Sequence, residues 1–257
     1  MIDTKLLEYI EFKYNININK FRYEEDNIIA FYNDTVPTMW DYNFIYFKKN
    51  PNLLKLIEIS NKEKVNNEKH NKNFLKVIFE INAILPQEIS DYYENLGLNC
   101  EEISFMTIDK YCLSTWKKYN DLKIILVNNA ELLDKHINFC YENDFKISKE
   151  YAENRKKLNL KIYTNEYFKI YSVYYKSNVI GTAEVFIYNN IAKIENIFIS
   201  EKFRNIGACT ELLKTIISNY NAEFYLATYT DDLAINLYTK LGFKVISKQI
   251  NLLNIFE

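Results

Sequence analysis

The sequence predicts a mixed α/β fold (α+β, with one central sheet and helices on both of its faces). Segments with the composition of strands alternate with segments of helical periodicity along most of the 257 residues, which is the pattern of this class. Apolar residues make up 48% of the chain, enough for packed cores, and the length allows one large or two ordinary domains. Only four residues are glycine, so each is expected where the backbone requires it.

Charge and cysteine content exclude several classes of protein. Basic and acidic residues balance to a net charge of −2, which leaves no basic surface for nucleic acid. No apolar run approaches the roughly eighteen residues of a membrane span, and an acid stands near the N-terminus where a signal peptide is basic. The four cysteines and two histidines lack metal-ligand spacing. We therefore expect a cytoplasmic protein with no metal, no nucleic-acid partner and no membrane partner.

The first half of the chain contains a predicted loop followed by a strand, a helix and a second strand. Residues 61–73 are polar without periodicity, so a solvated loop is predicted there. A strand is predicted over residues 74–81, followed by a helix that begins at Pro86 and ends at Gly97. A further strand is predicted over residues 103–108.

The second half contains a longer series of predicted elements. A strand is expected over residues 122–127, followed by helices over residues 130–143 and 148–158. Three strands then follow, over residues 167–175, 179–188 and 192–199, and after them a helix over residues 209–220. The last predicted elements are a strand over residues 224–228, a short helix that begins at Asp231 or Asp232, and a strand over residues 244–253.

The order strand, helix, glycine, strand occurs in both halves. Gly97 ends the helix in the first half, and Gly242 ends the corresponding helix in the second. A repeat of this kind indicates duplication, although so short a match also arises by chance. We therefore predict two domains of similar size, residues 1–118 and residues 119–257.

The helix that starts at Cys209 begins at a turn suited to an anion. Its apolar positions recur with helical period: Cys209, Leu212, Leu213, Ile216, Ile217 and Tyr220. A helix N-terminus offers unpaired N–H groups and a partial positive charge, to which Arg204 adds a formal charge. Gly207 lets a phosphate approach the backbone closely. The alternative is a tight turn in which the glycine only relieves backbone strain.

At these positions the chain resembles the GCN5-related N-acetyltransferase (GNAT) family. The coenzyme A loop of that family follows the pattern Gln/Arg-x-x-Gly-x-Gly/Ala, and Arg204, Gly207 and Cys209 occupy its three fixed positions. Cys209 departs from the usual glycine or alanine but is also small. The segment from Asp231 to Phe243 (DDLAINLYTKLGF) is similar to the last helix of the family and its glycine stop. The resemblance implies a GNAT fold in tandem and, because the first half lacks the loop, a degenerate N-terminal copy.

The resemblance also implies a set of cofactor-binding residues for acetyl-CoA as co-substrate. The backbone of Ile197, Phe198 and Ile199 is expected to pair with the pantetheine arm and hold the thioester carbonyl. The pyrophosphate is expected on the loop that follows Arg204, at the amides of Asn205, Ile206, Gly207, Ala208, Cys209 and Thr210. Asp231 stands where the family commonly has an asparagine, and an ionised carboxylate accepts a hydrogen bond but cannot donate one.

Two residues are candidates for acid–base catalysis. An alkylamine is mostly protonated at pH 7, so a base must take a proton before the amine attacks. Glu195 is the candidate base, because strand alternation predicts that it shares a face with Ile197 and Ile199 on a stretch where the family often has a carboxylate. Glu184 is a weaker alternative, and an ion-paired or solvent-facing Glu195 is the non-catalytic interpretation. Tyr238 matches the tyrosine of the family that protonates the leaving thiolate, although its helical spacing equally suits a core aromatic.

The sequence therefore predicts an N-acetyltransferase that acts on a primary amine of a small molecule or peptide, as a monomer or homodimer. A mildly acidic surface suits a cationic acceptor such as a polyamine, aminoglycoside, amino acid or peptide amine. A non-catalytic sensor of acyl-CoA is the alternative from another class. Aminoacyl transfer from charged tRNA is disfavoured by the lack of a basic surface, and a P-loop nucleotidase by the lack of Gly-Lys-Ser/Thr after Gly207.

Overall fold

The computed structural model describes residues 2–25, 27–70, 72–96 and 99–256, and its chain forms two compact units. Unit 1 consists mainly of residues 106–227 and 233–244, and unit 2 of residues 3–105, 228–232 and the segment from Val245 onward. Gly97, the predicted helix stop of the first half, lies outside the described residues. The predicted domains 1–118 and 119–257 describe the sequence repeat and stay a prediction.

Unit 1 contains a sheet with the strand order β6-β7-β8-β9-β10-β5. Its strands are β6 (Leu122–Leu126), β7 (Phe168–Tyr175), β8 (Asn178–Tyr188), β9 (Ile191–Ile199), β10 (Glu223–Tyr229) and, from Met106 onward, the end of β5 (Asn99–Ile108). Its helices are α4 (Ala130–Asp144), α5 (Lys149–Tyr163), α6 (Ala208–Asn219) and α7 (Ala234–Lys240), with a 3-10 segment, η2 (Lys110–Thr115), before β6. Every strand and helix predicted for this region is present. Helix α5 continues to Tyr163, and α7 begins at Ala234 rather than at Asp231 or Asp232.

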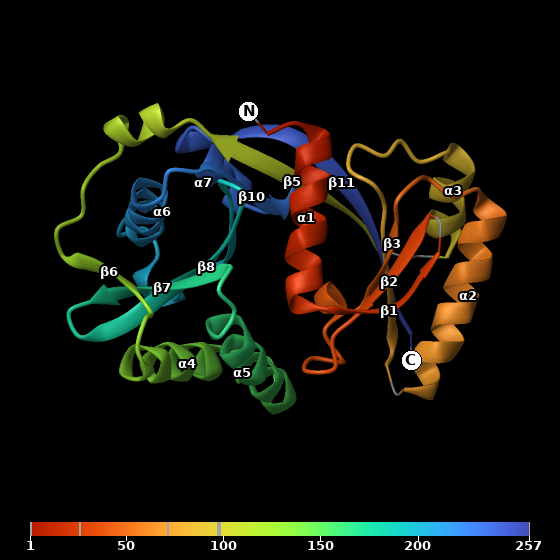
Figure 1. The fold of residues 1–257 in the computed structure, drawn as a ribbon, viewed down its shortest axis with the longest axis horizontal. Coiled ribbons are helices and arrows are strands. Elements are labelled where there is room, and N and C mark those ends of the chain that lie inside the picture. Colours follow the sequence, from red (N-terminus) through yellow and green to blue (C-terminus); the bar gives the residue numbers. More distant parts are fainter. Residues whose placement is uncertain (1, 26, 71, 97–98, 257) are drawn as a thin grey trace. The chain divides into compact units, whose positions relative to one another are not determined.

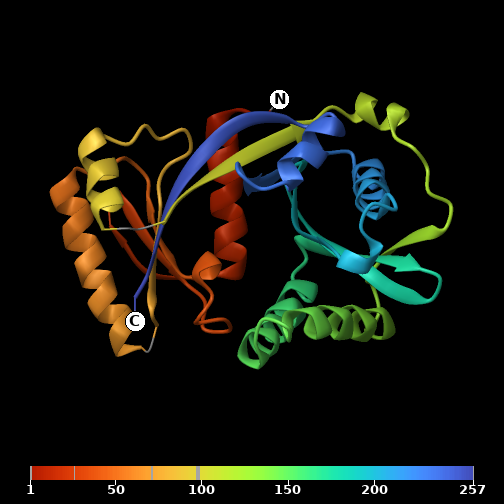
Figure 2. The same cartoon turned by 180° about the vertical axis from the view of Figure 1, so that it is seen from behind.

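The two faces of the unit 1 sheet differ in polarity. Helix α6 covers one face, and α4 and α5 cover the other (Figures 1 and 2). Val173 and Val185 belong to the apolar cluster that contains α6. Ser172, Thr182 and Glu184 alternate with these residues along β7 and β8 and contact side chains of α4 or α5. The face toward α4 and α5 is therefore unusually rich in buried polar groups.

Unit 2 contains the strand order β1-β2-β3-β4-β11, with helices on both faces of these strands. Its strands are β1 (Lys20–Glu25), β2 (Ile28–Tyr32), β3 (Phe44–Phe47), β4 (Phe74–Ile78) and β11 (Lys244–Ile255), and its helices are α1 (Thr4–Ile18), α2 (Leu53–Lys69) and α3 (Gln87–Asn95), with a 3-10 turn, η1 (Trp40–Tyr42). Phe12 and Ile16 of α1 pack on one face, whereas Leu56 of α2 and Ile89 of α3 pack on the other. Strands and helices thus form the three layers predicted for the fold class.

The predicted loop over residues 61–73 is wrong, because most of this stretch is helical. Helix α2 runs from Leu53 to Lys69, and its buried positions are Leu56, Ile59, Glu63 and Asn67. These positions have helical spacing, but two of the four are polar, so a search for apolar periodicity does not detect them. Glu63 pairs with Arg22, and Asn67 donates to the carbonyl oxygen of Phe74 at 2.8 Å, so both polar groups are satisfied inside the fold.

The two halves of the sequence repeat the same strand topology and exchange a strand. In each half two antiparallel strands are followed by a helix and a parallel strand, β2-β3-α2-β4 in the first and β8-β9-α6-β10 in the second. Strand β11, from the second half, pairs antiparallel with β4 in unit 2. The end of β5, from the first half, lies in unit 1, where Thr107 Oγ1 donates to the carbonyl oxygen of Phe224 at 2.8 Å. Each unit is therefore completed by a strand from the other half of the sequence.

Candidate functional site

The predicted cofactor loop lies between β9 and α6 and has the backbone of an anion-binding turn. After the 3-10 turn η3 (Glu201–Phe203), φ is +64° at Asn205 and +85° at Gly207, whereas Ile206 between them has no positive φ. Such alternation turns successive N–H groups toward one side, an arrangement that binds anions. Gly207 is the N-cap of α6, and no side chain of the described residues caps this end. The first N–H groups of α6 therefore remain open to an anionic ligand.

The missing side chain of Gly207 makes room for an aromatic ring. A Cβ atom at residue 207 would overlap Cζ and both Cε atoms of Tyr119. The backbone N–H of Tyr119 donates to Glu211 Oε2 in the first turn of α6 at 3.3 Å, which holds the ring at the loop. Glycine is thus required here by its left-handed φ and by a packed ring, besides the phosphate approach that the sequence predicts. Sequence reasoning missed Tyr119, because no local pattern links it to a loop so distant in the chain.

The loop side chains range from exposed to buried along the chain: Asn205 and Ile206 are exposed, Gly207 and Thr210 are half-buried, and Ala208 is buried. Arg204 remains exposed, and its Nε donates to the carbonyl oxygen of Ile199 at 3.3 Å. Burial raises the pKa of Cys209 to about 12, so its side chain is a neutral thiol that packs against the apolar cluster. Cys209 therefore substitutes for the glycine or alanine of the family as a small packing residue.

Strand β9 carries a bulge directly before the stretch predicted to hold the thioester. Thr182 of β8 lies opposite Phe198, and Glu184 lies opposite Glu195, so three steps along β9 match two along β8. Asn196 lies in this interval with φ of +50°. An extra residue in a left-handed conformation bends the strand and interrupts its pairing. Asparagine is one of the few residues besides glycine that tolerates this conformation.

Beyond the bulge, β9 parts from its parallel neighbour. Among the described residues, the pairing of β9 with β10 runs only as far as Ile194 opposite Leu226, although β9 continues to Ile199. The edge of residues 197–199 that faces β10 is consequently without a strand partner in the described part of the chain. An unpaired strand edge is a template for an extended ligand, because its N–H and C=O groups point outward at regular intervals.

The bulge also changes which residues share a face with Glu195. Phe198 lies opposite Thr182, and its ring centroid is 5.9 Å from that of Phe139 on α4, which places Phe198 on the face toward α4 and α5. Ile197 and Ile199 pack instead with the cluster on the α6 side. The prediction that Glu195 shares a face with Ile197 and Ile199 is therefore wrong, because the extra residue shifts the alternation by one.

Glu195 is held by a lysine on its own strand. Its Oε1 lies 2.6 Å from Nζ of Lys193, and the two side chains are 21% and 5% exposed, respectively. Glu184 on β8 lies directly opposite Glu195, so both carboxylates lie on the face toward α4 and α5. Lys193 therefore occupies one of the two oxygens through which Glu195 would act as a base. The role of Glu195 as base stays a prediction.

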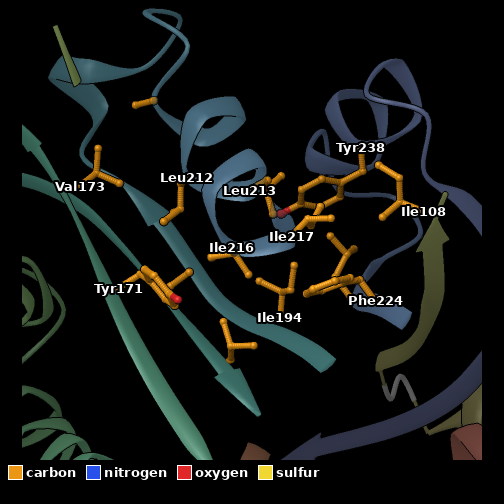
Figure 3. Packing of buried hydrophobic residues seen from close by; sticks show 14 of the residues in the cluster. Ile108, Tyr171, Val173, Ile194, Leu212, Leu213, Ile216, Ile217, Phe224 and Tyr238 are labelled. Atoms are coloured by element: carbon orange, nitrogen blue, oxygen red, sulfur yellow. The ribbon is translucent and has the colours of Figure 1, made fainter. Parts of the chain in front are cut away.

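Tyr238 lies in the core between α6 and α7. Its side chain is buried, and its ring centroid is 5.8 Å from that of Phe243. Figure 3 shows the ring pointing from α7 toward Leu213 and Ile217 of α6. The core interpretation of Tyr238 therefore accounts for its position, and its role as an acid toward the leaving thiolate stays a prediction.

Asp231 is the one predicted cofactor residue outside unit 1. It is exposed and lies in the turn between β10 and α7, among the residues of unit 2. Its predicted contact with the cofactor stays a prediction.

The polar face toward α4 and α5 contains a histidine beside a cysteine. His136 lies 3.3 Å from the hydroxyls of Ser172 and Thr182 and 3.6 Å from Cys140 Sγ. Burial lowers the pKa of His136 to about 4 and raises that of Cys140 to about 12. At neutral pH both groups are uncharged, so this pair lacks the thiolate of a cysteine nucleophile.

Two general findings concern metals and membranes. Across the residues that the structure describes, no group of three or more His, Cys, Asp or Glu side chains is arranged to hold a metal ion. Within the same residues, no helix combines the length and the apolar character needed to cross a membrane.

A mixed sheet whose bulged strand parts from its neighbour and leads into an anion-binding loop at a helix N-terminus defines the acyl-CoA N-acyltransferase fold class. Residues 131–243 match the model of the acetyltransferase (GNAT) family. The match runs from α4 to α7 and includes both sequence motifs. The predicted family resemblance is thereby confirmed, and with it the class of enzyme, an acetyltransferase of the GNAT type.

Solved structures of low sequence identity share the fold over most of the chain. A functionally unknown conserved protein from Staphylococcus epidermidis is 15% identical, with a TM-score of 0.78 over 93% of this chain and 95% of that one. A GCN5-related N-acetyltransferase from Kribbella flavida is 10% identical, with a TM-score of 0.67 over 98% and 95%. A tandem GNAT protein from the clavulanic acid biosynthesis pathway is 11% identical, with a TM-score of 0.51 over 76% and 67%. No curated protein matches by sequence.

Proposed function

We propose that the domain of residues 119–257 transfers an acetyl group from acetyl-CoA to a primary amine of a small molecule or peptide by direct attack. The amine nitrogen bonds to the thioester carbonyl carbon, the carbon–sulfur bond breaks, and coenzyme A leaves as a thiol after taking up a proton. The observation that carries the proposal is the sequence of features along the chain from Asn196 to Ala208. A bulged strand with a free edge runs directly into an anion-binding loop.

Two parts of unit 1 would each bind a different part of the cofactor. The edge of residues 197–199 would pair with the pantetheine arm and place the thioester, and the loop of residues 204–210 would bind the pyrophosphate. Most of the rate is expected from holding donor and amine together, since effective molarities reach about 10⁵ to 10⁸ M, whereas a general base contributes about 10² to 10⁴.

If Glu195 is the base, Glu195→Gln lowers the acetylation rate mainly below pH 8, where the amine is protonated, without abolishing it. The reason is that positioning, which this variant leaves intact, supplies the larger part of the rate. Steady-state rates from pH 6 to 10 measure the effect. A pH profile identical to that of the wild-type protein would reject Glu195 as base.

The experiment that tests the proposed function has two stages. Thermal unfolding is first followed with and without acetyl-CoA, because a ligand at about 100 times its Kd adds roughly 2.7 kcal/mol to the folded state. Release of free thiol is then measured across a panel of polyamines, aminoglycosides, amino acids and peptides. Absence of stabilisation would remove acetyl-CoA as ligand.

A second candidate is a non-catalytic acyl-CoA sensor, and the positions of two candidate catalytic residues favour it. Glu195 is already paired with Lys193, and Tyr238 is packed in the core. Such a protein would be stabilised by acetyl-CoA but would release no thiol with any amine. The second stage of the experiment therefore separates the two functions.

A further inference from the structure

The bulge at Asn196 is tied to the polar face of unit 1 by a buried carboxylate. Nδ2 of Asn196 donates to Glu184 Oε2 at 2.9 Å. The left-handed φ of Asn196 is unfavourable for a residue other than glycine, so the surrounding structure has to hold it. The carboxylate of Glu184 is the partner that the structure supplies for this purpose.

Glu184 itself is held from the opposite side by a helix. Its side chain is 3% exposed, and its Oε1 lies 3.8 Å from a terminal nitrogen of Arg155 on α5. Nε of the same arginine lies 3.9 Å from Asp144 Oδ2 on α4. Burial raises the pKa of Glu184, whereas Arg155 and Asn196 lower it. A carboxylate with so little exposure is tolerated because both of its oxygens have partners.

We propose that Glu184 is a positioning residue for the acyl group, which it aligns through Asn196. By fixing the bulge, Glu184 sets the direction of the β9 edge over residues 197–199, immediately after the pairing with β10 ends at Ile194. The proposal rests on the proposed function, because that edge is where the thioester carbonyl would bind. Glu184, the weaker candidate for the base, thus acts on the backbone rather than on the amine.

Three variants and a matched control test this role. Glu184→Ala removes the tie, Asn196→Gly removes it while keeping a residue that tolerates a positive φ, and Glu184→Gln keeps an acceptor for Asn196 but removes the charge that faces Arg155. Ser172→Ala is the control, since Ser172 is buried on the same face of β7 without contacting the bulge.

The main readout is the dissociation constant of acetyl-CoA compared with that of coenzyme A, which lacks the acetyl carbonyl. Glu184→Ala and Asn196→Gly are expected to raise the dissociation constant of acetyl-CoA by about two- to tenfold, which is the range of one hydrogen bond. The dissociation constant of coenzyme A should stay within about twofold of the wild-type value. A double variant that combines Glu184→Ala with Asn196→Gly should have the same dissociation constants as either single variant, because each substitution removes the same hydrogen bond. Glu184→Gln should keep the wild-type ratio of the two constants.

Three results would overturn the proposal. An unchanged ratio of the two constants in Asn196→Gly would show that the tie does not act on the acyl site. Additive effects in the double variant would show that the two residues act independently. Turnover abolished in Glu184→Gln with an unchanged ratio would make Glu184 the base instead.

Hydrogen exchange of the backbone amides of residues 195–199 gives a readout that needs no cofactor. It should rise in Glu184→Ala and Asn196→Gly and stay at the wild-type level in Ser172→Ala. A wild-type protein that binds neither acetyl-CoA nor coenzyme A would refute the proposed function, and the exchange of these amides would still decide whether Glu184 holds the bulge.

Discussion

Gly207 and Gly242 are the glycines of the two sequence motifs. Each of them packs against a side chain of one short segment, residues 112–119. The ring of Tyr119 lies against Gly207, and a Cβ at Gly242 would come within 2.9 Å of Cys112 Sγ. Both glycines have a positive φ, of +85° and +96°, so backbone and packing impose the same residue. The segment also carries Trp116, whose Nε1 donates to the carbonyl oxygen of Leu241 at 2.9 Å.

Gly207→Ala should weaken acetyl-CoA binding and lower the melting temperature, because alanine is strained at φ of +85° and its Cβ displaces the ring of Tyr119. The conformational part alone costs about 1–2 kcal/mol. Calorimetric titration and thermal unfolding measure both effects. Tyr119→Ala in the same chain should restore part of the loss, and an identical loss with or without the Tyr119 ring would contradict the packing explanation.

His136 should make the protein sensitive to acid. Its folded pKa of about 4 lies below the ordinary value of 6.5, so the unfolded chain takes up a proton that the folded protein resists. Stability is therefore lost as pH falls from about 6.5 to 4, by roughly 3 kcal/mol. Asp144 and Glu184, with raised pKa values, act in the opposite direction, because the folded protein holds their protons more tightly.

Urea unfolding at pH 7, 5.5 and 4.5 measures this loss. His136→Gln should unfold with a smaller loss of free energy between pH 7 and 4.5 than the wild-type protein. His70→Gln, which changes the exposed histidine at the end of α2, is the control and should follow the wild-type dependence. Equal pH dependence of the wild-type protein and His136→Gln would exclude His136 as the cause.

At the scale of elements, α2 and β9 show where local pattern fails. The buried stripe of α2 includes Glu63 and Asn67, so its amphipathic character is hidden in a polar sequence. In β9, strict alternation places Glu195 with the wrong neighbours, because it does not allow for the bulge at Asn196. In both cases a tertiary partner decides the outcome, Arg22 for the helix and Glu184 for the strand.

Glu63→Ala should destabilise unit 2 by about 2–4 kcal/mol, because it leaves the guanidinium of Arg22 facing a buried site without its carboxylate. Urea unfolding at pH 7 measures the loss. Glu58→Ala on the exposed face of α2 is the matched control and should stay within about 0.5 kcal/mol of the wild-type protein. A loss of similar size in the two variants would contradict a buried, polar stripe on α2.

Much of the fold of the second half could be predicted from the sequence, because its signals are local. The apolar stripe of α6 and the glycine of its first turn lie within a few residues of one another, and both cofactor motifs are short. The partners of these motifs are not local. Tyr119 on Gly207 and Glu184 on Asn196 follow from tertiary packing and strand pairing, which a single sequence does not encode in a nearby pattern.

At the scale of the whole molecule, the strand exchange separates sequence halves from structural units. The end of β5 belongs to unit 1, although most of unit 1 comes from the second half of the chain. Strand β11 pairs with β4 in unit 2, although it follows α7 in the sequence. The repeat in the sequence and the units in space are therefore two different divisions of the same chain.

A core substitution in the first half of the sequence should destabilise unit 1, and one in the second half should destabilise unit 2. Met106→Ala, in β5, should destabilise unit 1, and Leu252→Ala, in β11, should destabilise unit 2, each by about 2–5 kcal/mol, because both side chains are almost fully buried. Hydrogen exchange should rise in α6 and β10 for the first variant and in α2 and β4 for the second. The reverse pattern would contradict the exchange.

The exchange also bears on how such a chain changes over generations. If the first half descends from a duplicated acetyltransferase that lost its cofactor loop, the loss of that loop did not make the half dispensable. A gene shortened to the second half alone would encode unit 1 without the end of β5, including Met106, whose side chain is 1% exposed in its core. Selection for a stable cofactor-binding unit would then preserve the inactive half as a structural donor, whether or not that half binds anything itself.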